Sequence, residues 1–208
     1  GSFTPKLEDA VTLAQKMVDV GRLAGRNIAA LITNMDVPLG KAIGNSMEIT
    51  EACEILKNHG PSDLREVCVE LSSYMLWLCT DESYENCKNK VIRSLTDGSA
   101  FRKFRELVSA QGGDAAYIDN TDMFKKAMYS YDIKSSYSGF IHSMDTAAIG
   151  EVSLMLGAGR EKKEDTIDYE AGIYIHAKTG DKINEGQVLA TLYTNRKHII
   201  SEAEQEYL

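Results

Sequence analysis

The first part of the chain carries apolar residues at helical spacing. They recur every three or four positions, which predicts an amphipathic helix that Gly25 ends: Leu7, Ala10, Val11, Ala14, Met17 and Val18. Residues 27–35 follow as a short apolar run, which is typical of a buried strand. A helix followed by a buried strand predicts part of a parallel α/β sheet.

The middle of the chain predicts consecutive helices without strands between them. One helix is expected over residues 46–57. Ser62 and Asp63 are candidate caps of the next helix, whose apolar positions share one side: Leu64, Val67, Cys68, Leu71, Met75 and Leu78. Two more helices are expected over residues 84–95 and 99–111.

The pattern changes in the last third of the chain. Residues 129–144 alternate polar and apolar positions as a bent strand does, residues 147–156 predict a helix, and residues 188–194 predict a further strand. The fold class expected is therefore α/β in residues 1–125, followed by a separate α+β domain in residues 126–208.

Composition and charge exclude several classes of function. The chain has 208 residues, 43% of them hydrophobic, and a net charge of −8, so it has no basic footprint for nucleic acid or an anionic membrane. No apolar run reaches membrane-spanning length, and no leader sequence is recognised at the start. The four cysteines form no CxxC pair, which favours free thiols in a reducing cytoplasm over a disulfide framework.

Three stretches, taken in order, resemble the thymidine and pyrimidine-nucleoside phosphorylase family. They are residues 33–45 (TNMDVPLGKAIGN), residues 110–114 (AQGGD) and residues 156–160 (LGAGR), the last followed by KKED, AGI and KTGD. The resemblance implies the C-terminal part of the phosphorylase α/β domain in residues 1–125. For residues 126–208 it implies an α+β domain that contains a barrel-sandwich-like hairpin unit.

The family's activity is phosphorolysis, in which phosphate is the co-substrate and a pyrimidine nucleoside gives free base and a pentose 1-phosphate. The resemblance implies that the phosphate loop and the base contacts belong to an N-terminal half that is missing here. No catalytic residue is therefore assigned, and the chain alone is expected to be inactive. Family members are homodimers through N-terminal helices, so a monomer is expected for this chain. An exposed apolar surface is expected along residues 7–20 and 28–35.

The resemblance also implies a few site residues. In the intact enzyme a potassium ion is expected at the backbone carbonyls of Leu39 and Ala42 and the carboxylate of Glu51, which are oxygen ligands suited to a hard cation. The remaining ligands are expected from the missing half, so this chain alone should bind the ion weakly or not at all. Phe3 is expected to border the pyrimidine pocket of the whole enzyme. From the residues alone, the alternative for the loop is a tight turn made possible by Gly40, with Glu51 on a solvated helix face.

Three alternatives to a pyrimidine enzyme stay open at this point. The first is the corresponding part of a nucleotide phosphorylase of the AMP type, which retains the C-terminal domain. The second is a carrier-like module, because residues 171–192 resemble the hairpin-rich half of biotinyl and lipoyl domains, although no modifiable lysine stands on a central turn. The third is a non-catalytic structural module.

Overall fold

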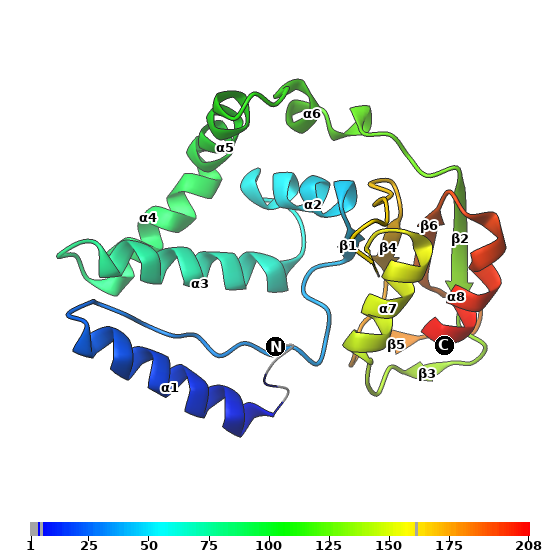
Figure 1. The fold of residues 1–208 in the computed structure, drawn as a ribbon, viewed down its shortest axis with the longest axis horizontal. Coiled ribbons are helices and arrows are strands. Elements are labelled where there is room, and N and C mark those ends of the chain that lie inside the picture. Colours follow the sequence, from blue (N-terminus) through cyan, green and yellow to red (C-terminus); the bar gives the residue numbers. More distant parts are fainter. Residues whose placement is uncertain (1–3, 5, 161) are drawn as a thin grey trace.

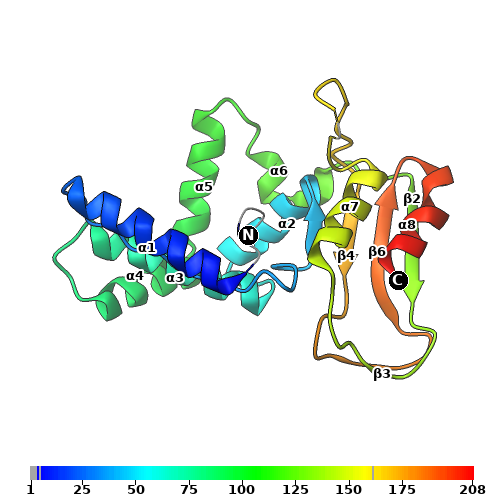
Figure 2. The same cartoon turned by 60° about the horizontal axis from the view of Figure 1, so that its bottom comes forward.

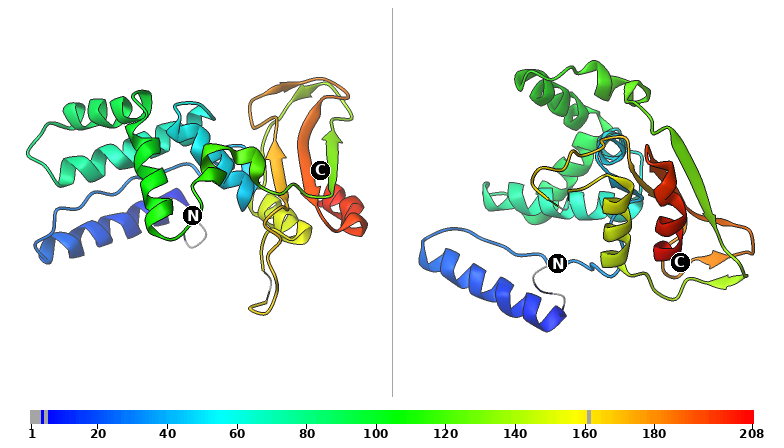
Figure 3. Two further views of the ribbon diagram at one scale, coloured as in Figure 1. Left: turned by 90° about the horizontal axis from the view of Figure 1, so that it is seen from above. Right: turned by 45° about the vertical axis from the view of Figure 1, so that its right-hand side comes forward.

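The computed structural model describes residue 4 and residues 6–160 and 162–208. The helical part of the chain and the part that contains the β-sheet lie at opposite ends of the molecule (Figures 1 and 3). None of the described helices is both long and apolar enough to cross a membrane.

Helix α1 (Leu7–Leu23) confirms the first predicted helix, and Gly25 follows it with a φ of +71°. The predicted strand over residues 27–35 is wrong, because these residues form no strand. They run back alongside α1 as an extended segment, and Ile28 packs against Gly21 (Figure 1). A strand needs a neighbouring strand for its N–H and C=O groups, and the described residues place none beside this segment.

The predicted block of consecutive helices is confirmed. It comprises α2 (Ser46–Leu56), α3 (Ser62–Leu78), α4 (Tyr84–Thr96), α5 (Ser99–Ala110), the short α6 (Ala116–Asp119) and the 3-10 turn η1 (Thr121–Met123). Helix α3 packs on α4, and α4 leads into α5 through Gly98, which has a φ of +72°. These helices surround only a small set of fully buried side chains, among them those of Cys53 and Cys87.

The main sheet is antiparallel and has four strands in the order β1-β4-β6-β2. Its strands are β1 (Ala42–Gly44), β2 (Tyr129–Lys134), β4 (Gly172–Ile175) and β6 (Val188–Thr194). A second sheet pairs β3 (Gly139–Phe140) with β5 (Lys182–Ile183). The parallel sheet expected from the sequence is therefore wrong for the described residues, which form a mixed fold of eight α-helices and small antiparallel sheets.

The main core lies under one face of the four-stranded sheet. Helices α7 (Thr146–Leu156) and α8 (Ile200–Tyr207), the second preceded by the 3-10 turn η2 (Lys197–Ile199), cover this face (Figure 2). Alternate strand residues point into it, which is the period-two pattern of a half-buried sheet. The fully or almost fully buried members are Ile133, Ile149, Val152, Leu156, Ala171, Ile173, Ile175, Ala190, Leu192 and Ala203.

Strand β1 joins the helical part of the chain to this sheet through a close glycine crossing. A Cβ atom on Gly172 would lie 2.3 Å from the carbonyl oxygen of Ile43, and one on Gly44 would lie 2.6 Å from that of Ala171. Only glycine allows the two backbones to approach this closely. The predicted boundary between two domains at residues 125–126 stays a prediction. The main sheet contains β1, which belongs to the first predicted domain, beside strands of the second.

Substitution of Gly172 by alanine tests this crossing. The added methyl group has no room against the Ile43 carbonyl oxygen, so β1 must separate from β4. We expect the free energy of unfolding in urea to fall by roughly 1–3 kcal/mol, the usual cost of overpacking. The matched control is Gly150→Ala in α7, where the new methyl group meets nothing within 4 Å and the helix should gain up to about 1 kcal/mol. Equal stabilities of G172A and wild type would contradict the crossing.

Candidate functional site

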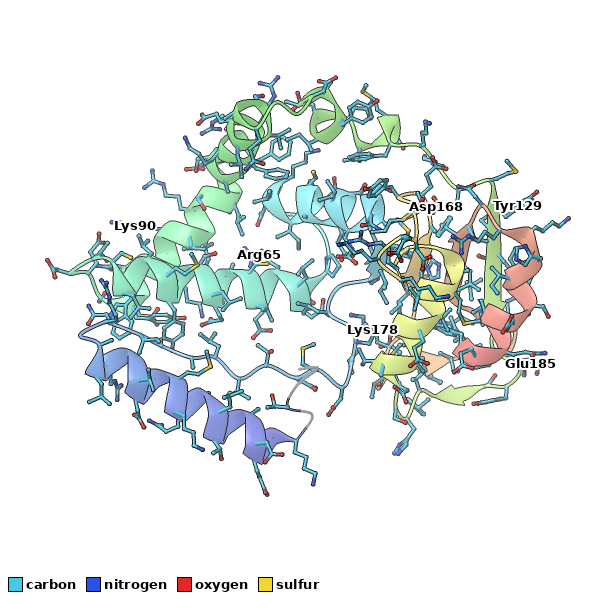
Figure 4. All side chains as sticks on the ribbon, viewed as in Figure 1. Arg65, Lys90, Tyr129, Asp168, Lys178 and Glu185 are labelled. Atoms are coloured by element: carbon cyan, nitrogen blue, oxygen red, sulfur yellow. The ribbon has the colours of Figure 1, made fainter. Side chains whose placement is uncertain are left out.

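The loop that leads into β1, residues 38–42, is held by side chains from three separate elements. Glu51 comes from α2, Asp63 from the first turn of α3, and Lys178 from the turn that follows β4. Figure 4 shows Lys178 at the boundary between the sheet and the loop. We call residues 38–42 the 38–42 loop.

Lys178 and Asp63 hold the first half of the loop. The Lys178 Nζ atom donates to the carbonyl oxygen of Pro38 and to Asp63 Oδ2, both at 2.7 Å. The same Oδ2 atom accepts from the backbone N–H of Gly40 at 3.2 Å. The Lys178 side chain is 18% exposed, so this ion pair is largely shielded on the lysine side and is stronger than a pair in open solvent.

Glu51 holds the second half of the loop. Its Oε1 atom accepts from the backbone N–H groups of Lys41 at 2.9 Å and Ala42 at 3.2 Å. Its Oε2 atom lies beside Gly40, where a Cβ atom would stand only 2.2 Å away, and Gly40 has a φ of +69°. Glycine is therefore required at position 40 for both the backbone conformation and the space.

The carbonyl group of Ala42 faces away from the sheet, on the side of Glu51. The carbonyl oxygen of Lys41 accepts from the N–H of Ile175 at 2.8 Å, so Ala42 and Tyr174 form the neighbouring non-hydrogen-bonded pair. In such a pair both backbone groups of a residue point away from the partner strand. Because β1 is an edge strand, the N–H of Ala42 reaches Glu51, and its C=O points to the same side.

The structure thus brings together two of the three predicted cation ligands, Ala42 and Glu51, and places Leu39 three residues earlier on the same loop. No described backbone N–H donates to the Leu39 carbonyl oxygen. Nor do the described residues contain a cluster of three or more His, Cys, Asp or Glu side chains that could hold a metal. Any cation here would therefore depend on backbone oxygens together with the Glu51 carboxylate, a donor set that suits a hard ion.

The two carboxylates of the site have opposite pKa shifts. Burial is the largest influence on Glu51 and raises its pKa, although the N–H groups of Lys41 and Ala42 and the charge of Lys178 oppose it. Burial also acts to raise the pKa of Asp63, but the hydrogen bond from Lys178 and those from the Leu64 and Gly40 N–H groups outweigh it. The pKa of Asp63 is consequently below its usual value. Negative charge is favoured at Asp63 and disfavoured at Glu51.

Sequence reasoning missed Asp63 and Lys178 as members of this site. Asp63 was a candidate helix cap, yet Pro61 is the N-cap residue of α3 and the Asp63 carboxylate faces the loop. Lys178 belongs to the KTGD turn of the resemblance, but no local pattern links it to Asp63. Phe3, the predicted neighbour of the pyrimidine, lies outside the described residues.

Comparison with known proteins places this loop in a family context. Residues 140–208 match the family model described as "Pyrimidine nucleoside phosphorylase C-terminal domain". The pyrimidine-nucleoside phosphorylase of Geobacillus stearothermophilus is 38% identical over 200 residues, which are 96% of this chain and 46% of that protein. Those of Staphylococcus aureus strains USA300 and NCTC 8325 are 41% identical with the same coverage. The chain spans about half the length of these relatives.

Replacement of Glu51 by glutamine tests the buried charge. Because the pKa of Glu51 is raised above 4.5, its carboxyl contributes stability that is fully present below pH 4.5 and is lost as the pH rises through the raised pKa. Glutamine does not ionise. In urea unfolding we expect the stability of E51Q relative to wild type to increase between about pH 4 and about pH 7.

The control for this measurement is Glu48→Gln. Glu48 lies on the same helix and accepts from the N–H of Gly44 at 3.0 Å, but its side chain is exposed. E48Q is the matched reference for E51Q, because it makes the same change at an exposed position of the same helix. A difference for E51Q that stays flat, or that falls with pH, would mean that the Glu51 charge is not desolvated.

Proposed function

Because this chain belongs to the pyrimidine-nucleoside phosphorylase family, we propose that it forms the C-terminal half of an enzyme that phosphorolyses pyrimidine nucleosides. In that reaction an oxygen of phosphate bonds to the anomeric carbon of the pentose, and the bond from this carbon to the base nitrogen breaks. The base leaves with the electron pair and becomes protonated. Identity of 38–41% to these enzymes over 96% of the chain carries the proposal.

The part that this chain plays is to hold a monovalent cation and to support the loop that binds it. The carbonyl oxygens of Leu39 and Ala42 and the Oε2 atom of Glu51, to which none of the described residues donates, would hold a potassium ion, with further ligands from the rest of the enzyme. The outward carbonyl of Ala42 beside the Glu51 carboxylate supports this assignment. When bound, the ion supplies a fixed positive charge that orders the loop. We assign no catalytic residue to this chain.

The fold of residues 126–208 is consistent with the barrel-sandwich-like hairpin unit of our proposal, and it also argues against a carrier. The antiparallel pairing of β3 with β5 and of β4 with β6 supports this assignment. A carrier presents its modified lysine on an exposed turn. The sequence here that most resembles such a turn is Asp181-Lys182-Ile183. Its lysine, Lys182, lies in strand β5 opposite Phe140 instead of on a turn. An AMP-type phosphorylase is not favoured either, because the relatives cited above are pyrimidine-nucleoside phosphorylases.

The rest of the enzyme is the partner that we propose for the exposed apolar surface. Helix α1 has no buried residue, and a groove of about 350 Å³ separates it from residues 28–35. Monomeric soluble proteins rarely expose so continuous an apolar surface. Eight of its large side chains are at least 44% exposed: Leu7, Val11, Leu13, Met17, Val20, Leu23, Ile32 and Met35.

Two further expectations belong to this proposal. The four cysteines are free thiols, which is consistent with a reducing cytoplasm. The whole enzyme would be a homodimer through helices outside this chain, and this chain alone a monomer.

Phosphorolysis assays test the proposed division of labour. With uridine or thymidine, phosphate and potassium chloride, we expect this chain alone to release no base. A chimera in which the N-terminal half of the Geobacillus stearothermophilus relative precedes this chain should release base. In the chimera, E51Q should lower activity at limiting potassium more than at saturating potassium.

The outcomes of this assay separate clearly. Base release by this chain alone would place a complete catalytic centre within these residues and overturn the proposal. A folded chimera without activity on either nucleoside would also overturn it. Equal activity with potassium and with choline chloride would remove the cation from the proposal and leave the phosphorolysis in place.

Dye binding tests the apolar surface. Anilinonaphthalene sulfonate should fluoresce strongly with the folded chain, and the double variant Met17→Ser, Val20→Ser should bind markedly less dye, because both side chains are at least 60% exposed on α1. The control is Phe140→Ser, which removes a side chain of 68% exposure from β3 and should leave most of the signal. An unchanged signal in the α1 variant would contradict the assignment of the surface.

A further inference from the structure

We propose that Lys178 is a positioning residue through which the C-terminal domain fixes the 38–42 loop for cation binding. The statement about the loop stands on geometry alone, and only its link to a cation rests on the proposed function. Lys178 lies within residues 140–208, which match the C-terminal domain model, whereas the loop belongs to the first part of the chain. The domain would thus act on the loop from outside it.

The contacts of Lys178 give it control over the loop conformation. Its ammonium group is bonded to the Pro38 carbonyl oxygen and to Asp63, and Asp63 in turn holds the Gly40 N–H. These contacts fix the two residues on either side of Leu39. The direction of the Leu39 carbonyl group therefore depends on Lys178, although the two residues share no hydrogen bond.

Charge gives a second reason why the loop needs the ammonium group of Lys178. Asp63 and Glu51 hold adjacent parts of one short loop, and their negative charges repel each other, while Lys178 attracts both. Without the ammonium group, two carboxylates would share a half-buried site with no fixed counter-charge. One of them would turn towards solvent and release its backbone N–H group.

A sheet contact from the same domain holds the other end of the loop. The N–H of Ile175 donates to the carbonyl oxygen of Lys41 at 2.8 Å, and the β1–β4 pairing continues from there. The loop is therefore fixed by backbone pairing at residue 41 and by the Lys178 side chain at residue 38. Only the side-chain contact can be removed without breaking the sheet, which makes Lys178 the residue to test.

The experiment compares amide hydrogen exchange in the chain and in the double variant Asp63→Asn, Lys178→Met. This variant removes the ion pair without changing the net charge, so long-range electrostatics stay matched. We expect the Gly40 amide to exchange at least about tenfold faster, as loss of a charge-assisted hydrogen bond implies. The Leu192 amide in the core strand β6, which does not pair with β1, should keep its protection and serves as the internal reference. Lys178→Arg, which keeps the charge, should recover part of the Gly40 protection.

Potassium binding is measured on the chimera with the Geobacillus stearothermophilus N-terminal half, because that half supplies the remaining ligands, as the rise in melting temperature in potassium chloride over choline chloride at equal ionic strength. We expect this rise in the chimera with the wild-type chain and a smaller one in the chimera with the double variant. Unchanged Gly40 protection in a folded double variant overturns the positioning role. Lys178→Gln, which leaves the Asp63 acceptor of the Gly40 N–H in place, decides by the same criterion, also where the double variant loses protection throughout, including at Leu192.

The two measurements distinguish the two ideas. Loss of Gly40 protection in Lys178→Gln with no potassium response in any chimera would support Lys178 as the residue that fixes the loop and would remove the cation. A potassium response of equal size in wild type and double variant would keep the cation and overturn the role of Lys178 in its binding.

Discussion

The structure depends on the pairing of β1 with β4 across Gly44 and Gly172. This pairing brings a three-residue strand from the helical part of the chain onto the edge of the C-terminal sheet. The approach is too close for any side chain, so the register between the two parts is fixed by backbone atoms. The position of the 38–42 loop follows from it, because the loop enters β1 directly.

Once β1 is fixed, the side chains around the loop are brought together from distant parts of the sequence. Glu51 lies near the loop because α2 starts immediately after β1, and the turn between α2 and α3 brings Asp63 back to the loop. Lys178 arrives from the opposite direction, at the end of β4, the strand that pairs with β1. The site therefore depends on the sheet register as much as on the loop sequence. A shift of one residue in the β1–β4 pairing would separate these side chains from the loop.

The sequence predicted the elements whose signal is local. The helices from α2 to α5 and α7 appear where apolar spacing placed them, because one turn of helix is specified by residues three and four apart. Residues 27–35 have the composition of a buried strand, but a strand forms only beside another, and no described strand accompanies it. Asp63 and Lys178 could not be joined in advance, because their contact depends on tertiary folding across 115 positions.

The use of the loop's N–H groups decides which kind of ion it can bind. Glycine-containing loops commonly present several N–H groups to one point and so bind phosphate. Here the N–H groups of Gly40, Lys41 and Ala42 are already taken by the carboxylates of Asp63 and Glu51. What the loop has left to offer is carbonyl oxygen, beside a carboxylate whose second oxygen has no hydrogen bond from the loop. Such a loop suits a cation and disfavours phosphate, so the 38–42 loop is not itself a phosphate site.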